Sequence, residues 1–128
     1  MKLNFDGAAK GNPGPAGYGG IFRNGQGVAE WIYAEYGGTM TNNEADFMAA
    51  YQGIKTTRRL GYRKLEIEGD STLVVNTLKK LIQGKNWDKV ATSWRSASIV
   101  QDIAELLKEI DYKIVSHVRR EEINLLIA

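Results

Sequence analysis

The order of apolar and polar residues predicts strands in the first third of the chain. Residues 2–8 alternate between polar and apolar side chains, the period of a strand with one buried face. The Gly- and Pro-rich stretch Lys10–Gly17 is predicted to be a loop. Two further apolar runs, Tyr18–Arg23 and Val28–Gly38, flank Asn24-Gly25, a strong hairpin signal. The pattern therefore predicts a three-stranded antiparallel meander.

Helical spacing begins after Thr41, where residues with high helix propensity extend from about Asn43 to Leu60 and Gly61 ends the run. The segment Lys85–Trp94 has no clear period. The remaining predicted elements are a strand over Lys64–Asp70, a helix within Ser71–Gly84 capped by Ser71 or Thr72, a helix within Ser96–Ile110 and a strand over Asp111–Val118.

This element order predicts an α/β domain with a mixed five-stranded sheet, in which three antiparallel strands precede parallel crossovers and helices flank the sheet. The 128 residues fit one domain, 1–128. Apolar and charged contents of 43% and 25%, without cysteine or a membrane-length apolar run, indicate a soluble, intracellular protein. A net charge of +2 permits a polyanionic partner without requiring one.

Two carboxylates are candidates for chemistry. Asp6 and Asp70 each end a predicted strand, and sites in open α/β sheets form outside the carboxyl ends of strands. If these strands are parallel neighbours, the two acids lie side by side, an arrangement that a divalent cation stabilises. The alternative is that Asp70 caps the next helix and Asp6 is a turn residue.

Four motifs, FDGAAKGNPGPAGYGG, TNNEADF, EGDSTLVV and HVRREE, occur in the order and at about the spacing found in type 1 ribonuclease H. The chain resembles especially the plant and archaeal-like branch of that family. The resemblance implies a ribonuclease H-like fold. It also implies endonucleolytic cleavage of the RNA strand of RNA–DNA hybrids, with two Mg²⁺ or Mn²⁺ ions held by four acidic residues.

The resemblance assigns three of those four acids. Asp6 and Asp70 match the first and third carboxylates, and Asp46 stands where the family has the second, a glutamate. Glu44 lies about 200° away from Asp46 around the helix, so it is expected to be a first-turn acid without a metal-binding role. Because Asp is one methylene shorter than Glu, a weakened metal site is expected.

The fourth motif begins at His117 and departs from the family pattern after Glu122. Ile127 stands where the fourth acid is expected, and the chain stops at Ala128, before the family's usual C-terminal helix. A reading-frame slip, a deliberate mutation and natural divergence all remain open. We expect a monomer whose C-terminal helix is missing or truncated, with self-association through the apolar end as an alternative.

The resemblance also assigns hybrid-binding residues, which contact the RNA minor groove: Ala8, Ala9, Gly11, Asn12, Asn42, Asn43 and Asn76. Without it, Asn42 and Asn43 would be interpreted as helix caps, Asn42 in particular. Candidates for phosphate contacts are Lys10, Lys79, Lys80, Lys85, Lys89, Arg119 and Arg120.

Three further residues have a structural and a functional interpretation. Trp87 and Trp94 are expected to pack in the interior rather than stack on nucleic acid, and His117 is expected to be structural. Two functions therefore remain in view. The first is a metal-dependent RNA–DNA hybrid ribonuclease that uses Asp6, Asp46 and Asp70. The second is a catalytically impaired module that binds the hybrid without cutting it.

Overall fold

The computed structural model describes residues 1–119. Its elements, in chain order, are β1 (Lys2–Ala9), β2 (Gly14–Arg23), β3 (Ala29–Met40), α1 (Asn42–Arg59), β4 (Lys64–Gly69), α2 (Thr72–Ile82), α3 (Trp87–Val90), α4 (Trp94–Leu107) and β5 (Tyr112–His117). Every strand and long helix predicted from the sequence is present. The short helix α3 lies in the segment for which no period was evident.

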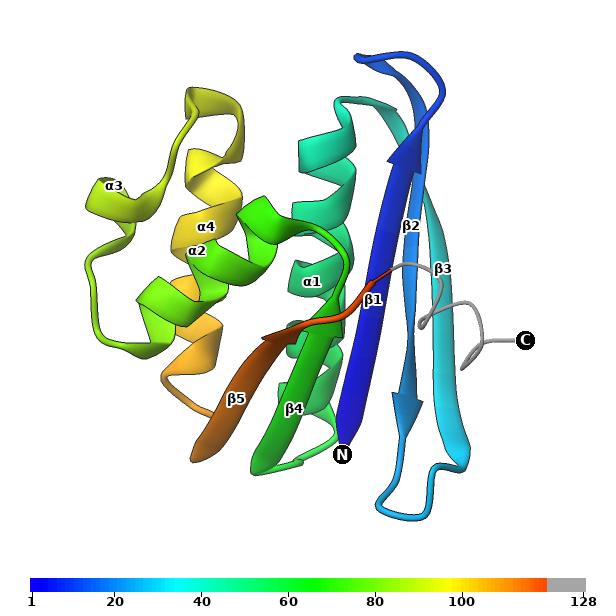
Figure 1. The fold of residues 1–128 in the computed structure, drawn as a ribbon, viewed down its shortest axis with the longest axis vertical. Coiled ribbons are helices and arrows are strands. Elements are labelled where there is room, and N and C mark those ends of the chain that lie inside the picture. Colours follow the sequence, from blue (N-terminus) through cyan, green and yellow to red (C-terminus); the bar gives the residue numbers. More distant parts are fainter. Residues whose placement is uncertain (120–128) are drawn as a thin grey trace.

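The five strands form one mixed sheet in the order β3-β2-β1-β4-β5. β1 pairs antiparallel with β2 and parallel with β4, while β4 pairs parallel with β5. The antiparallel meander followed by parallel crossovers is the architecture predicted from the element order. Figure 1 shows the long helices gathered on one side of this sheet.

The core lies between that helical layer and the inward face of the sheet. Apolar residues at alternate positions of the strands, such as Leu3, Phe5 and Ile67, are at most 1% exposed. Gly53 in α1 lets the helix approach closely, since a Cβ there would overlap the side chain of Leu3. The opposite face carries exposed apolar side chains, including Ile32.

Two turn predictions need correction. β2 already begins at Gly14, so the predicted loop Lys10–Gly17 shrinks to a tight turn whose flanking residues pair in the ladder, with Lys10 N–H donating to Pro15 O at 2.8 Å. The β2–β3 hairpin does not turn on two residues. The Asn24 side chain instead accepts hydrogen bonds from Gln26 N and Val28 N, which closes a longer loop.

Candidate active site at the strand ends

Asp6 and Asp70 follow a pair of neighbouring residues on the adjacent parallel strands β1 and β4. The register pairs Phe5 of β1 with Gly69 of β4, and Asp6 and Asp70 come directly after this pair. The prediction that Asp6 ends its strand is wrong, because β1 continues to Ala9 by pairing with β2, but Asp6 lies where the pairing of β1 with β4 ends. Gly69 permits this close pairing because a Cβ there would overlap the Phe5 ring. Both aspartates are half-buried. The adjacency expected from the sequence is confirmed.

Asp46, in the first turns of α1, reaches β1 next to Asp6. Its Oδ1 accepts a hydrogen bond from Gly7 N–H at 3.0 Å, one residue beyond Asp6. Gly7 is buried, and a Cβ at this position would overlap the Ala45 carbonyl group and lie 2.7 Å from Asp46 N. The absence of a side chain at Gly7 therefore brings the helix start against β1.

The donor chemistry of these carboxylates suits a divalent cation, since Mg²⁺ and Mn²⁺ prefer oxygen ligands. Asp6 and Asp70 supply such oxygens where the pairing of β1 with β4 ends. Within residues 1–119, however, no three acidic, histidine or cysteine side chains are grouped so that they could hold a metal ion. The carboxylates of Asp6 and Asp70 therefore fit a divalent cation. One carboxylate oxygen of Asp46, by contrast, is already engaged by the hydrogen bond from Gly7 N–H.

His117, the last residue of β5, lies beside Asp70. Its Nε2 is 2.8 Å from the Asp70 carbonyl oxygen, and Val118 N–H donates to Gly69 O at 2.9 Å. Because a carbonyl oxygen only accepts, Nε2 must carry the proton in this contact. These contacts hold the end of β5 to the end of β4, as expected for a structural histidine.

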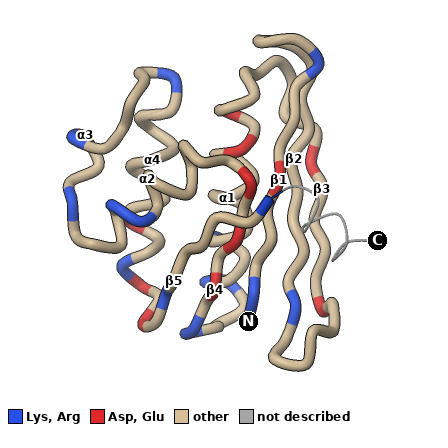
Figure 2. The backbone as a smooth tube through the Cα atoms, in the orientation of Figure 1, with Lys and Arg blue, Asp and Glu red and all other residues tan. Residues whose placement is uncertain are grey.

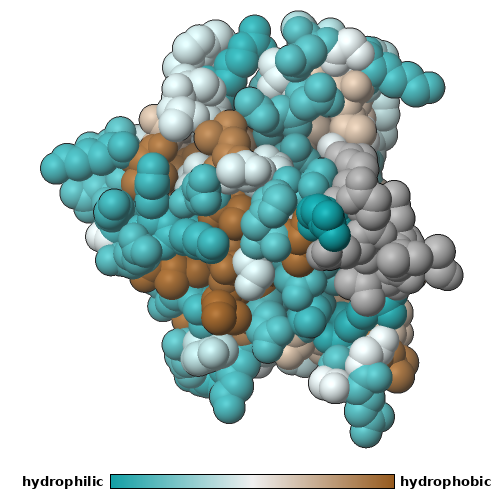
Figure 3. Space-filling model, in the orientation of Figure 1, coloured by the Kyte–Doolittle hydropathy of each residue, from teal (hydrophilic) through white to brown (hydrophobic). Residues whose placement is uncertain are grey.

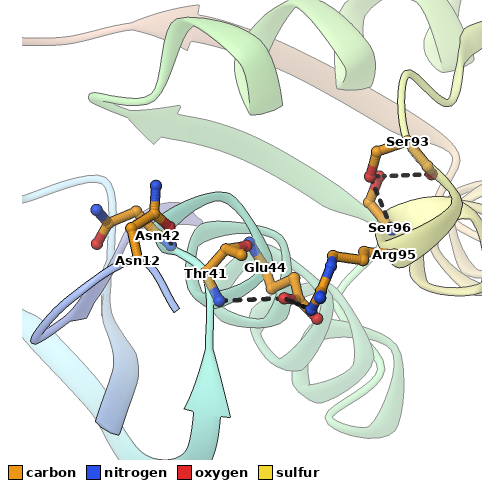
Figure 4. A network of polar contacts seen from close by, with 7 residues as sticks. All are labelled: Asn12, Thr41, Asn42, Glu44, Ser93, Arg95 and Ser96. Carbon is orange, nitrogen blue, oxygen red and sulfur yellow. Dashed lines mark hydrogen bonds and ion pairs between the residues drawn. The ribbon is translucent and has the colours of Figure 1, made fainter. Parts of the chain in front are cut away.

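Three of the predicted hybrid-binding residues are linked by hydrogen bonds. Ala9 N–H donates to Asn42 Oδ1 at 2.9 Å, and Asn42 N–H donates to Asn12 Oδ1 at 3.0 Å. Figure 4 shows Asn12 and Asn42 side by side next to Thr41. Exposed positions are also occupied by Ala8, Gly11, Asn43 and Asn76, the last of these on α2.

The interpretation of Asn42 or Asn43 as a helix cap is wrong, because Thr41 caps α1. Thr41 Oγ1 accepts from Glu44 N–H, and Glu44 Oε1 accepts from Thr41 N–H, both at 3.1 Å. This reciprocal pair is a capping box, and the spacing T-x-x-E is the signal that predicts it. Glu44 thus has a structural role, as expected.

Glu44 also pairs with Arg95, a residue that the sequence did not single out. Arg95 Nη1 lies 3.4 Å from Glu44 Oε1, and the Glu44 side chain is 19% exposed. The hydrogen bond from Thr41 N–H is the main cause that lowers the pKa of Glu44, with smaller contributions from the Thr41 hydroxyl and from Arg95. The pair ties the first turn of α4 to the N-terminus of α1 (Figure 4).

Exposed lysines predicted to contact phosphate gather near α2 and α3. Lys80, Lys85 and Lys89 line one cleft of about 460 Å³, together with Asn86. Figure 2 shows several blue, basic stretches of the backbone around α2 and α3. Lys79 is exposed on α2, Lys10 lies in the turn between β1 and β2, and Arg119 is exposed after β5.

Trp87 and Trp94 differ in how far they are buried. Trp87 is half-buried against the core and lines a cleft of about 260 Å³ between α2, α3 and α4. Figure 3 shows hydrophobic surface on this helical side of the molecule. Trp94 is 82% exposed, so the expectation that it packs in the interior is wrong. It is the first residue of α4, and the buried residues of this helix begin only at Ser96.

The remaining predictions on the fourth motif concern Arg120, Glu121, Ile127 and the C-terminal helix. These positions lie outside the described residues. Among residues 1–119, no helix is long and apolar enough to cross a membrane.

Comparison with known proteins decides the family. The family model described as "Reverse transcriptase-like" matches residues 4–125. Ribonuclease HI of Halobacterium salinarum is 35% identical over 119 residues, which cover 91% of this chain and 55% of that protein. Ribonuclease H of Marinobacter nauticus is 32% identical over 115 residues, which cover 88% of this chain and 71% of that protein. The chain belongs to the ribonuclease H family.

Solved structures of the ribonuclease H family agree. The crystal structure of the Halobacterium salinarum RNase H1 superposes with a TM-score of 0.80 at 28% identity, covering 94% of this chain and 86% of that chain. LC11-RNase H1 in complex with an RNA/DNA hybrid gives 0.78 at 25% identity with the same coverages. The predicted ribonuclease H-like fold is confirmed. The chain spans 55%, 62% and 60% of the lengths of three ribonuclease H relatives.

Proposed function

We propose that this chain is a metal-dependent ribonuclease H domain that hydrolyses the RNA strand of RNA–DNA hybrids endonucleolytically. The observation that carries the proposal is the register of β1 and β4, which sets Asp6 beside Asp70 at the open end of the sheet. Family membership supports it, and one structural neighbour is in complex with an RNA/DNA hybrid.

In this proposal Asp6 and Asp70, with Asp46, hold Mg²⁺ or Mn²⁺. Such ions, when bound, supply an activated water for attack on the phosphodiester and neutralise the leaving oxygen. The task of the protein is to hold the three carboxylates in place. The parallel register orients Asp6 and Asp70, and the hydrogen bond from Gly7 orients Asp46.

The hybrid is proposed to lie across the surface formed by Ala8, Ala9, Gly11, Asn12, Asn42 and Asn43, with Asn76 at its margin. Small residues and amides suit this task because the RNA minor groove presents 2′-hydroxyls that both donate and accept hydrogen bonds. The hydrogen bonds that join Ala9, Asn12 and Asn42 hold the turn after β1 against the start of α1. The surface is therefore preorganised.

A catalytically impaired hybrid-binding module is the second candidate. The observation that favours it is that Asp46 uses one carboxylate oxygen for Gly7 N–H, while no three ligating side chains within residues 1–119 are grouped for a metal ion. A site with a shorter second acid has less reach toward a cation. Both candidates share the hybrid-binding surface, so binding alone does not separate them.

A cleavage assay separates the two candidates. The chain is incubated with an RNA–DNA hybrid labelled on the RNA strand, with Mg²⁺ and with Mn²⁺, and double-stranded DNA is the control substrate. Cleavage of RNA that is lost in Asp6→Asn and Asp70→Asn supports the enzyme. Binding without cleavage under either metal would establish the binding module, and cutting of the control DNA would contradict both.

We further propose that the chain acts as an intracellular monomer. Exposed apolar side chains on the helix-free face of the sheet lie at its two opposite edges, with Ile32 and Tyr36 on β3 and Ile114 on β5. Light scattering at high protein concentration tests this proposal. A mass of 14.2 kDa is expected, and a dimer would contradict it.

A further inference from the structure

Trp94 is the most exposed of the large apolar side chains in residues 1–119, at 82%. Tryptophan is normally well buried because its ring carries a large apolar surface. The neighbouring Thr92, Ser93 and Arg95 are polar and exposed. This is a single aromatic ring in a polar setting, too small for a stable protein interface, which buries roughly 800 Å² on each partner.

The Trp94 ring is held in place by its neighbour, Arg95. The Arg95 guanidinium lies over the Trp94 ring, 5.1 Å from its centroid, and also pairs with Glu44. Glu44 in turn is held by two hydrogen bonds to Thr41. The cation is thus held between the carboxylate and the aromatic face, which restricts the orientation of the first turn of α4.

This turn borders the proposed hybrid surface. Thr41, which anchors Glu44, immediately precedes Asn42, and Asn42 contacts both Ala9 and Asn12. Figure 4 shows Arg95 approaching Glu44 from α4, while Asn12 and Asn42 lie on the other side of Thr41. Trp94 directly precedes Arg95 in the first turn of α4, so it lies at the α4 end of this series of contacts.

We propose that Trp94 is a stacking platform for one nucleotide of the RNA–DNA hybrid, at the α4 border of the interface. This inference rests on the proposed function. Base faces inside a duplex are covered by the neighbouring base pairs, but the sugar of every nucleotide offers an apolar face, so an exposed tryptophan that packs on it binds without sequence preference. Arg95 acts as a positioning residue that holds the ring and adds positive charge toward the backbone phosphates.

The test measures binding of a short, fluorescein-labelled RNA–DNA hybrid in EDTA, so that cleavage does not intervene. Trp94→Ala is expected to weaken binding by about 5-fold, the lower end of the range for loss of one aromatic contact to nucleic acid, because the ring packs on a sugar and not on an unpaired base. Trp94→Phe keeps an aromatic face and is expected to restore most of the affinity. The dependence of affinity on salt should not change in Trp94→Ala, because no charge is removed.

Tyr112→Ala is the matched control, since Tyr112 is 55% exposed but lies at the start of β5, the opposite end of the sheet from the acids. It is expected to bind like wild type. Wild-type affinity in Trp94→Ala, or an equal loss in Trp94→Phe, would overturn the platform.

Asn42→Ala distinguishes a failure of the Trp94 platform from a failure of the hybrid-binding function. If it weakens binding while Trp94→Ala does not, the platform is wrong and the hybrid-binding function stands. If the wild-type chain binds no hybrid, both are wrong.

Discussion

Gly7 N–H and Asp46 Oδ1 are joined by a hydrogen bond of 3.0 Å, which links the strand that carries the first acid to the helix that carries the second. The strand and the helix are tightly packed at this bond, because Gly7 is buried against the backbone of Ala45 and Asp46. Asp46 therefore has a structural partner as well as its proposed ligand role. The two roles are separable by substitution.

Asp46→Asn is expected to remove cleavage while leaving stability within about 0.5 kcal/mol of wild type, because the amide oxygen still accepts from Gly7. Asp46→Ala is expected to lose cleavage and also about 1–3 kcal/mol of unfolding free energy, since the buried Gly7 N–H loses its partner. Urea denaturation and the hybrid cleavage assay measure the two effects. Equal stability of the Asn and Ala variants would show that the bond contributes nothing.

Asp46→Glu restores the residue that the family has at this position. The added methylene extends the carboxylate by about 1 Å, which is about twice the roughly 0.5 Å placement tolerance of a catalytic group. We expect tighter Mg²⁺ binding and faster hydrolysis, both followed by a metal titration of the cleavage rate. Asp102→Glu, on the exposed surface of α4, is the control for the substitution itself. A slower Asp46→Glu enzyme would argue that the site has adapted to aspartate.

Gly7→Ala is expected to destabilise the fold by about 1–3 kcal/mol, because the added Cβ meets the Ala45 carbonyl and Asp46 N, which belong to backbone and cannot rotate away. Cleavage should fall as well, since α1 must shift away from β1. Gly25→Ala is the matched control, as a Cβ there meets nothing within 4 Å. The prediction fails if both variants unfold at the same urea concentration.

These residues show what the sequence could predict. The period-two and helical patterns identified the elements, because each element buries one face, and parallel pairing of β1 and β4 put Asp6 and Asp70 together. Asp46 was placed by family resemblance, and its bond to Gly7 depends on a helix-to-strand distance that no spacing encodes. Arg95 and Trp94 were missed or misjudged for the same reason. Their roles depend on where the start of α4 lies relative to α1, a long-range contact.

Thr41→Ala is expected to cost about 1 kcal/mol, the usual loss for a threonine cap, because the hydroxyl bond to Glu44 N–H disappears. Glu44→Gln is the matched variant, since glutamine completes a capping box as well as glutamate does. It should keep most of the stability while losing the ion pair with Arg95. Thermal unfolding compares the two variants. A loss of stability in Glu44→Gln as large as that in Thr41→Ala would show that the charge of Glu44, and not the cap, provides the stability.

Tyr33 is half-buried between β3 and α1, where its hydroxyl donates to Ala49 O at 2.7 Å. Burial raises the pKa of Tyr33 far above its usual value, with a smaller contribution from Tyr18. A raised pKa means that the neutral form stabilises the folded state. Its contribution is complete below the unfolded pKa of about 10 and is lost as pH rises above it.

Tyr33→Phe is accordingly expected to be less stable than wild type by about 1 kcal/mol at pH 7, and to lose less stability than wild type above about pH 10. Urea unfolding across this pH range checks both statements. Tyr112→Phe, at an exposed position, is the matched control. Parallel pH profiles of Tyr33→Phe and wild type would contradict the prediction.

Lys80, Lys85 and Lys89 share one cleft, so a phosphate backbone lying there would be neutralised by all three. Each lysine that contacts a hybrid phosphate contributes about 0.9 to the slope of log affinity against log salt. Replacing Lys85 and Lys89 together with glutamine should lower that slope by about 1.8, with little change in affinity at high salt. Lys64→Gln, at the opposite end of the sheet, should leave the slope unchanged. An unchanged slope in the double variant would place the strand elsewhere, while a lowered slope would extend the interface from Asn42 across α2 to α3.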